Sequence, residues 1–85
     1  MERDQLPSIA FGQIIRELRE TAGLTQQVVG EKFGSDRAHV SALERARQGP
    51  SIATIFSIAN SLQVPVSTLM EQVETRLATL REDKS

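Results

Sequence analysis

The side chains best suited to recognising another molecule gather between residues 26 and 47, where amides, small residues and cations alternate with apolar positions. An arginine can donate two hydrogen bonds to O6 and N7 of guanine, the commonest specific contact in the major groove of DNA, and Arg37 is our first choice for it. Ala38 and Ala42 cannot hydrogen-bond through their side chains, but their methyl groups could pack on a thymine methyl. Ser41 could contact a base or a phosphate. These residue types favour base recognition.

Two short helices separated by a turn at Gly34 would bring these side chains to one surface. The apolar residues have the spacing of one buried face on each helix, with Val28, Val29 and Phe33 on the first and Val40 and Leu43 on the second. Gly30 leaves room for a close approach. The opposite face of the second helix carries Arg37, Ala38, Ser41, Ala42 and Arg45. This pattern predicts a helix-turn-helix, although the same alanines would also suit an ordinary solvated helix.

Further polar residues flank this face where a phosphate backbone would pass. Thr25 is placed to cap the first helix of the motif, whose free amide hydrogens would favour a phosphate, and Gln26 and Gln27 follow it. Arg45 and Arg47 come at the end of the second helix, where cations beside DNA have a clear use. The full expected DNA-binding set is Thr25, Gln26, Gln27, Arg37, Ala38, His39, Ser41, Ala42, Arg45 and Arg47.

Two residues early in the second helix have a structural interpretation beside the functional one. Asp36 more readily caps the helix N-terminus than it accepts a hydrogen bond from cytosine, and both interpretations stay open. His39 lies between the buried and exposed faces, where its ring can pack and its nitrogen can reach a phosphate. It is the only histidine and the chain has no cysteine, so no second ligand of these types exists to share a metal. We expect no metal site.

The order of these residues resembles the Cro/C1-type helix-turn-helix regulators, the XRE family. The resemblance covers about residues 11 to 70 and rests on Thr25-Gln26, Gly30, Gly34, Val40, Leu43, Glu44, Pro50-Ser51 and Leu62-x-Val64. It implies an all-α, compact five-helix, lambda-repressor-like DNA-binding domain with the helix-turn-helix at helices 2 and 3. It also implies that Gln26 contacts the DNA backbone and can brace the recognition helix, and that Arg19 pairs with Glu44. The run DRAHVSALERARQGPS is similar, more weakly, to restriction-modification controller proteins.

Two positions depart from the family pattern. Ser35 stands where an apolar residue is usual, so the turn is either less well anchored or gains an extra cap. Ala46 follows Glu44-Arg45 where a glycine is common. We therefore expect the second helix of the motif to continue one turn further, carrying Arg45 and Arg47 toward the phosphate backbone.

Three more helices would support the motif within a single domain of residues 1–85, with a core at about residues 8–70. The first is expected to run from the N-cap Ser8 to Ala22, before the stop at Gly23. The fourth opens at Pro50-Ser51 and carries a face of core residues, namely Ile52, Ile55, Phe56, Ala59 and Leu62. The last begins near residue 67 or 68, where Thr68-Leu69-Met70-Glu71 matches a capping box.

The last helix predicts a homodimer. Its apolar residues lie within about 100° of one another on a helical wheel, and they are Leu69, Met70, Val73, Leu77 and Leu80. A helix over residues 68–82 would be roughly 22 Å long and would outrun a small core, leaving Leu77 and Leu80 in water unless a second copy covers them. The alternative is a monomer with a frayed tail. Residues 81–85 are expected to be disordered.

Composition and charge bound the remaining possibilities. Eighty-five residues suit one small domain, and the absence of cysteine excludes disulfides and thiolate metal sites. No stretch approaches the roughly 20 apolar residues of a spanning helix, so we expect a soluble, cytoplasmic protein with no membrane contact. The chain holds ten Lys plus Arg against eleven Asp plus Glu, whereas residues 13–50 hold six cations and five anions. We expect modest non-specific DNA affinity, with specificity gained by dimerising.

These observations predict a transcriptional regulator that binds double-stranded DNA as a homodimer on a near-palindromic operator and regulates its own operon. We expect no cofactor and no small-molecule ligand. With one histidine, no cysteine and no glycine-rich phosphate loop, the chain offers no candidate catalytic residues, so an enzyme is excluded. The alternative is a protein–protein interaction module that keeps this fold without binding DNA, which the low basicity supports.

Overall fold

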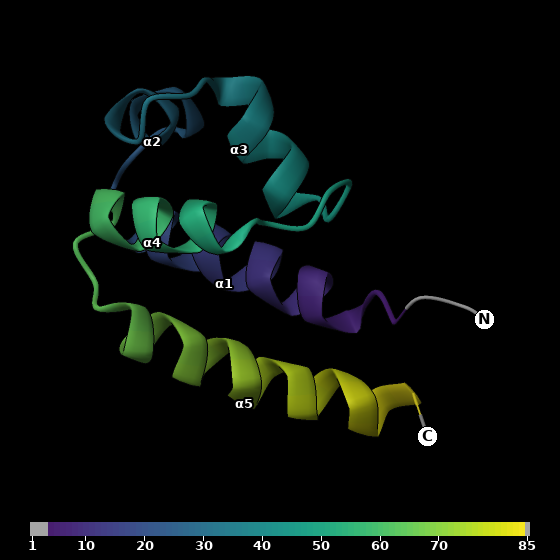
Figure 1. Cartoon of the computed structure of the whole chain (residues 1–85). Helices are drawn as coiled ribbons and strands as arrows, with labels where there is room; N and C mark the ends of the chain where they lie inside the picture. The colour runs from purple at the N-terminus through teal and green to yellow at the C-terminus, as the bar shows by residue number, and fades with distance from the viewer. Residues whose placement is uncertain (1–3, 85) are drawn as a thin grey trace.

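The computed structural model describes residues 4–84, which fold into five helices (Figure 1). The helices are α1 (Leu6–Thr21), α2 (Gln26–Lys32), α3 (Arg37–Glu44), α4 (Ile52–Ser61) and α5 (Val66–Lys84). In Figure 1, α2 and α3 lie together at one side of the domain, α5 lies at the other, and α1 and α4 lie between them. The regular structure of the described residues is all helical, which confirms the expected five-helix all-α fold.

α1 begins at Leu6, two residues before the expected N-cap. The carboxylate of Asp4 accepts a hydrogen bond from the Leu6 amide at 3.0 Å. Pro7 lies in the first turn, where its missing amide hydrogen costs no helical bond. Ser8 therefore lies inside the helix, and its assignment as N-cap is wrong. At the other end, Gly23 follows the helix with φ +72°, which confirms the glycine stop.

Side-chain caps fix the unit made by α2, the turn and α3. The Thr25 hydroxyl accepts a hydrogen bond from the Val28 amide at 3.1 Å, and the Asp36 carboxylate accepts one from the His39 amide at 2.9 Å. Between the two caps, Gly34 adopts φ +74°, a left-handed conformation that costs glycine little. These contacts confirm the predicted helix-turn-helix and show that Asp36 acts as an N-cap.

Two glycines let helices approach more closely than a side chain would permit. A Cβ atom on Gly30 of α2 would lie 2.6 Å from the carbonyl oxygen of Asp36. A Cβ atom on Gly12 of α1 would lie 2.7 Å from the carbonyl oxygen of Glu44, at the end of α3. Both distances are shorter than a van der Waals contact, so the seating of α3 against α1 and α2 requires glycine at these positions. The sequence indicates the close approach at Gly30 but not the one at Gly12.

α3 ends at Glu44, short of its expected end. The Arg47 amide donates to the carbonyl oxygen of Ala42 at 2.8 Å, and the Ala46 amide donates to that of Leu43 at 3.1 Å. This pair of bonds is a Schellman motif, and it places Ala46 at φ +56°. The prediction that α3 continues another turn is therefore wrong, because Ala46 takes the left-handed conformation usual for glycine, at a cost of roughly 1 to 2 kcal/mol.

One apolar cluster joins the five helices. Its buried members are Ala10, Phe11, Ile14, Ile15, Val29, Val40, Leu43, Ile58, Ala59, Leu62, Leu69 and Val73. α4 contacts both α2 and α5, and its buried face runs through Ile58 and Leu62. Ile52 and Phe56 lie away from that face and are 75% and 59% exposed. The expectation that these two residues belong to the core is wrong.

α5 packs along α1 of the same chain (Figure 1). Leu69 and Val73 are buried in the core, and Met70, Leu77 and Leu80 are partly buried against it. The expectation that Leu77 and Leu80 stay in water without a second copy is therefore wrong, because α1 is long enough to cover them. The apolar stripe of α5 is a contact within the domain, and the reason for placing a dimer interface there is lost.

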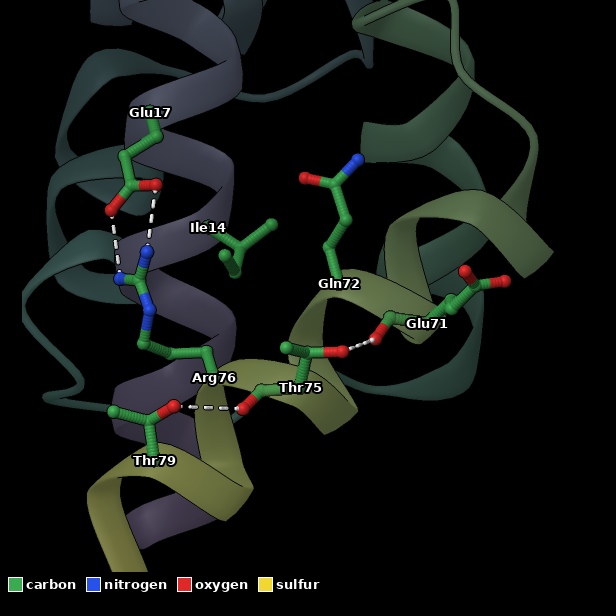
Figure 2. A pocket seen from close by; sticks show the side chains of 7 residues that line it. All are labelled: Ile14, Glu17, Glu71, Gln72, Thr75, Arg76 and Thr79. Carbon is green, nitrogen blue, oxygen red and sulfur yellow. Dashed lines mark hydrogen bonds and ion pairs between the residues drawn. The ribbon is translucent and has the colours of Figure 1, made fainter.

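An ion pair ties α5 to α1 beside this apolar contact. The Arg76 guanidinium lies 2.7 Å from Oε2 of Glu17 and donates to its Oε1 at 2.8 Å (Figure 2). The hydrogen bond from Arg76 lowers the pKa of the Glu17 carboxyl. Ile14, Gln72 and Thr75 line the same shallow hollow, of about 250 Å³, which lies on the side of α1 that faces α5. The residues that line it all belong to α1 and α5, and none of them belongs to α3.

The ends of α5 differ from those predicted. The helix begins at Val66, so Thr68 lies within its first turn and does not cap it; the capping-box prediction is wrong. The helix runs to Lys84, and Arg81 donates to Asp4 at 2.8 Å. The predicted disorder is therefore wrong for residues 81–84, while residue 85 lies outside the described residues.

Across the described residues no single helix is long and apolar enough to cross a membrane. Only the pair Ile52–Ser61 and Val66–Asp83, taken together across a 107° bend, meets that test by length and composition.

Candidate nucleic-acid interface

The exposed side of α3 carries the residues expected to read bases. Arg37 and Ala38 are exposed at the start of the helix, and Ser41 and Ala42 are partly exposed one turn later. Val40 and Leu43 are buried on the opposite side. α3 therefore presents a face of small side chains with one long cation at its N-terminal end. Such a face can approach the floor of a groove, and the contact of these four residues with DNA stays a prediction.

A hollow of about 500 Å³ lies between this end of α3 and the start of α2. Its lining consists of Arg19, Gly23, Leu24, Thr25, Gln26, Gln27 and Arg37. The structure thus brings Arg37 close to Thr25, Gln26 and Gln27, the residues at the start of α2 that we expect to contact a phosphate. Gln27 donates through its amide nitrogen to Glu31 at 3.1 Å, which leaves its amide oxygen and second hydrogen for other contacts. The residues from both helices of the motif form one continuous surface.

A polar cluster behind this surface fixes α3 to the rest of the domain. Nε of Arg19 donates to Oε2 of Glu44 at 2.7 Å, and its Nη2 donates to Oε1 at 3.0 Å. The side chains are 13% and 3% exposed, so the pair is almost fully buried. Nη1 of Arg19 also donates to the carbonyl oxygen of Leu24 at 2.9 Å. The hydrogen bond to Glu44 raises the pKa of Arg19. The pairing that the family resemblance implies is confirmed.

Gln26 joins the same cluster from the start of α2. Its amide nitrogen donates to Oε1 of Glu44 at 3.0 Å, so one carboxylate receives bonds from both α1 and α2. This contact confirms that Gln26 braces the recognition helix. Its contact with the DNA backbone stays a prediction. Because Glu44 lies at the last turn of α3 and its side chain is buried, the cluster holds the helix from the side opposite its exposed face.

Ser35 anchors the side chain of His39 and does not bond to the backbone of α3. Its hydroxyl lies 2.7 Å from Nδ1 of His39, and the imidazole ring also packs against Phe33 with ring centroids 5.4 Å apart. The ring is therefore held from two sides with Nδ1 occupied. Nε2 is the nitrogen left for an outside partner such as a phosphate. Both ideas for Ser35 are corrected: the serine neither weakens the turn nor caps the helix backbone, because its partner is a side chain one turn away.

Exposed cations outnumber exposed anions on the motif. Between residues 25 and 47, the exposed cations are Lys32, Arg37, Arg45 and Arg47, and the exposed anions are Glu31 and Asp36. The third carboxylate of this range, Glu44, is buried and paired with Arg19. The surface that would meet DNA is therefore more positive than the chain as a whole, whose formal net charge is −1. The low overall basicity loses much of its weight against DNA binding.

Comparison with known proteins identifies the fold and its family. The family model HTH_3, described as helix-turn-helix, matches residues 15–69. The chain belongs to this family. It has the lambda-repressor-like fold of the Cro/C1-type helix-turn-helix family, which is a family of DNA-binding transcriptional regulators and not of enzymes. The immunity repressor of Bacillus phage phi105 is 34% identical over 62 residues, which cover 73% of this chain and 43% of that repressor. The match thus spans less than half of this relative's length.

Two solved controller proteins share the structure of this HTH_3 chain. The restriction-modification controller protein C.AhdI from Aeromonas hydrophila gives a TM-score of 0.70 at 34% identity, covering 73% of this chain and 94% of its own. C.Esp1396I, solved as a tetramer in complex with its natural 35 base-pair operator, gives a TM-score of 0.75 at 25% identity, covering 91% and 99%. These matches confirm the predicted resemblance to both Cro/C1-type regulators and controller proteins.

Proposed function

We propose that this protein is a repressor that binds a near-palindromic operator as a homodimer and regulates its own operon in the cytoplasm. The observation that carries the proposal is the construction of α3. Its outer face is exposed and lined by small side chains beside Arg37, while the Arg19–Glu44 pair holds it from behind. A rigidly held helix with an accessible face is what a major-groove reader requires. The operator complex of the related controller C.Esp1396I supports this function.

Each part of the interface has a role in this proposal. α3 enters the major groove, where Arg37 donates to guanine and neighbouring base edges meet Ala38, Ser41 and Ala42. The phosphate backbone of one DNA strand passes the start of α2 at residues 25–27 and Nε2 of His39. The phosphate backbone of the other DNA strand passes the exposed cations Arg45 and Arg47. These phosphate contacts set the register, and the base contacts set the sequence preference.

A homodimer suits the modest charge of this surface. Four exposed cations per protomer limit the number of phosphates that one copy can neutralise, so one copy binds weakly at physiological salt. Two copies related by a two-fold axis would place their recognition helices in successive major grooves, roughly 34 Å apart. The second half-site then adds affinity without new kinds of contact.

A gel-shift experiment at low salt against fragments from upstream of the protein's own gene tests the proposal. The wild type should shift one fragment in preference to random DNA of the same length. Arg37→Ala should weaken operator binding by about 1 to 3 kcal/mol, roughly 5- to 150-fold, and relax the preference at one base pair. Arg16→Ala is the matched control, because Arg16 lies on α1 and its side chain is 62% exposed in an i,i+4 pair with Glu20.

Two outcomes would contradict the proposal. Equal loss of affinity by Arg37→Ala on operator and on random DNA would show that this arginine contacts phosphate only. The absence of any shifted band for the wild type would favour an interaction module that keeps this fold without binding DNA.

A further inference from the structure

The half-buried ring of His39 lies on the flank of α3 and is held from inside the domain. The ring packs against Phe33 with the centroids 5.4 Å apart and the ring planes at 55°, and the Ser35 hydroxyl lies 2.7 Å from Nδ1. Phe33 in turn packs against the apolar core. The Ser35 amide donates to the carbonyl oxygen of Gly30 on α2 at 2.8 Å. Both neighbours of the ring are therefore anchored, and Nε2 is the ring nitrogen left to bond outward.

The hydroxyl of Ser35 suits this position because it can both donate and accept a hydrogen bond. When the ring is neutral with its proton on Nε2, the hydroxyl donates to Nδ1. When the ring carries two protons, Nδ1 donates to the hydroxyl oxygen. In both states Nε2 holds a hydrogen for a phosphate oxygen, whereas the other neutral form would present a lone pair to it. Ser35 therefore lets the ring gain a proton without losing its inner bond.

Within residues 4–84, no carboxylate forms an ion pair with this ring. The charged residues on the two elements that hold the ring are Glu31 and Lys32 at the end of α2 and Asp36 and Arg37 at the start of α3. Glu31 accepts from Gln27, and Asp36 accepts from the backbone amide of His39 at 2.9 Å. α4, which contacts α2, contains no charged residue, and the buried cation of α1 pairs with the carboxylate at the end of α3. A phosphate at Nε2 would thus be the counter-ion of a charged ring.

We propose that Ser35 is a positioning residue for DNA binding, which holds His39 with Nε2 available to a backbone phosphate, and that the ring takes up a proton when the phosphate binds. This inference rests on the proposed operator-binding function and adds its regulation by pH. A nearby anion favours the charged form of a histidine, so the bound protein holds more protons than the unbound protein. By linkage, operator affinity rises as the pH falls.

The composition of the chain makes this proton easy to trace. Histidine is the side chain that ordinarily changes its charge between about pH 5 and about pH 8. His39 is the only histidine, and the chain has no cysteine. A pH dependence of binding in this range that disappears when His39 is replaced therefore belongs to one known side chain.

Operator affinity measured against pH and salt tests the uptake of the proton, using the full chain and the fragment selected by gel shift. From about pH 8 to about pH 5.5, the affinity of the wild type should rise about 5-fold for each bound protomer, because a neutral hydrogen bond becomes charge-assisted. The plot of log affinity against log salt should be steeper at the lower pH by about 0.9 for each protomer, since one more phosphate is neutralised. His39→Gln can donate but cannot gain a proton, so it should show neither change.

Calorimetry in two buffers with different heats of ionisation counts the proton directly. At about pH 6.5, where a histidine is ordinarily part-protonated, the wild type should take up protons on binding operator DNA and His39→Gln should take up none. The N-terminal amine and the carboxylates are common to both proteins, so their contribution cancels in the comparison.

A double-mutant cycle on operator affinity tests whether Ser35 acts through His39. Ser35→Ala should weaken binding about 2- to 10-fold in the wild-type background, the range expected for one lost hydrogen bond, and should have no effect in the His39→Gln background. Ser35→Thr keeps the hydroxyl and should restore both the affinity and its pH dependence. Ser67→Ala, at an exposed serine in the first turn of α5, is the matched control and should change neither. Affinities are referred to the folded fraction from urea unfolding, so a loss of stability does not mimic the effect.

The outcomes separate this inference from the proposed function. A wild type whose affinity depends on pH and salt as that of His39→Gln does would overturn the inference and leave operator binding intact. An equal effect of Ser35→Ala in both backgrounds would overturn the positioning role, because a serine needed only for the turn acts without the histidine. A wild type that shifts no DNA at any pH would overturn the proposed function and the inference together.

Discussion

Replacing Arg19 with methionine should both loosen the recognition helix and destabilise the domain. Methionine keeps much of the packing of the arginine stem but leaves Glu44 without its bidentate partner. The Glu44 side chain is 3% exposed, so its charge would stay buried. Removing one partner of a buried ion pair costs about 3 to 5 kcal/mol. Because Gln26 still donates to Glu44 at 3.0 Å, we expect the lower end of this range. In a domain of this size, about 3 kcal/mol lowers Tm by roughly 12 to 24 °C.

A double-mutant cycle in urea, followed by circular dichroism, measures this coupling. Arg19→Met/Glu44→Met removes both charges and should be more stable than Arg19→Met alone, since an apolar pair replaces a buried unpaired carboxylate. The control is Arg16→Met, whose partner Glu20 lies 3.5 Å away with both side chains more than half exposed. That exposed pair should contribute less than about 1 kcal/mol. If Arg19→Met cost no more than the control, or if the two Met substitutions were additive, the bracing role of the cluster would be refuted.

Two further variants test the close packing of the domain. Gly30→Ala should destabilise the protein by about 1 to 3 kcal/mol, because the added Cβ atom would lie 2.6 Å from the Asp36 carbonyl oxygen and push α3 away. Operator binding should weaken as well. An unchanged midpoint of urea unfolding would show that α2 can shift to make room for the methyl group. Leu77→Ser/Leu80→Ser should lower the free energy of unfolding while leaving the folded fraction able to dimerise, since both side chains pack within the protomer. Loss of the dimer with unchanged stability, seen by sedimentation and urea melts, would return the interface to α5.

The predictions that succeeded from sequence concern contacts between residues a few positions apart. Thr25 and Asp36 cap helices because a hydroxyl or carboxylate at that position reaches the amides three residues later. Ser51 caps α4 in the same way, accepting from the Thr54 amide at 3.1 Å. Gly34 makes the turn because a left-handed conformation is needed there. The Arg19–Glu44 pair joins residues far apart in sequence, and only the family resemblance indicated it.

The predictions that failed concern which neighbour covers an apolar face. The apolar residues of α4 and its C-cap fit two overlapping stripes, and helical spacing alone does not choose between the stripe through Ile52 and Phe56 and the stripe through Ile58 and Leu62. The choice follows from the positions of α2 and α5. On α5, the stripe itself was correct, but a wheel does not say whether α1 or a second chain lies opposite. The role of Ser35 was missed because its partner is a side chain of the following helix.

The division of α3 into a fixed side and a free side has a consequence for how this regulator can diverge. Substitutions at Val40, Leu43 or Glu44 act on the core or the buried ion pair and would threaten folding. Substitutions at exposed positions such as Arg37 and Ala38 usually change stability by no more than about 0.5 kcal/mol. A duplicated copy could thus acquire a new operator through changes on one face, while both copies keep the same fold. If the regulator acts as the proposed homodimer, the two copies could still form mixed dimers, unless the contact between protomers changed as well.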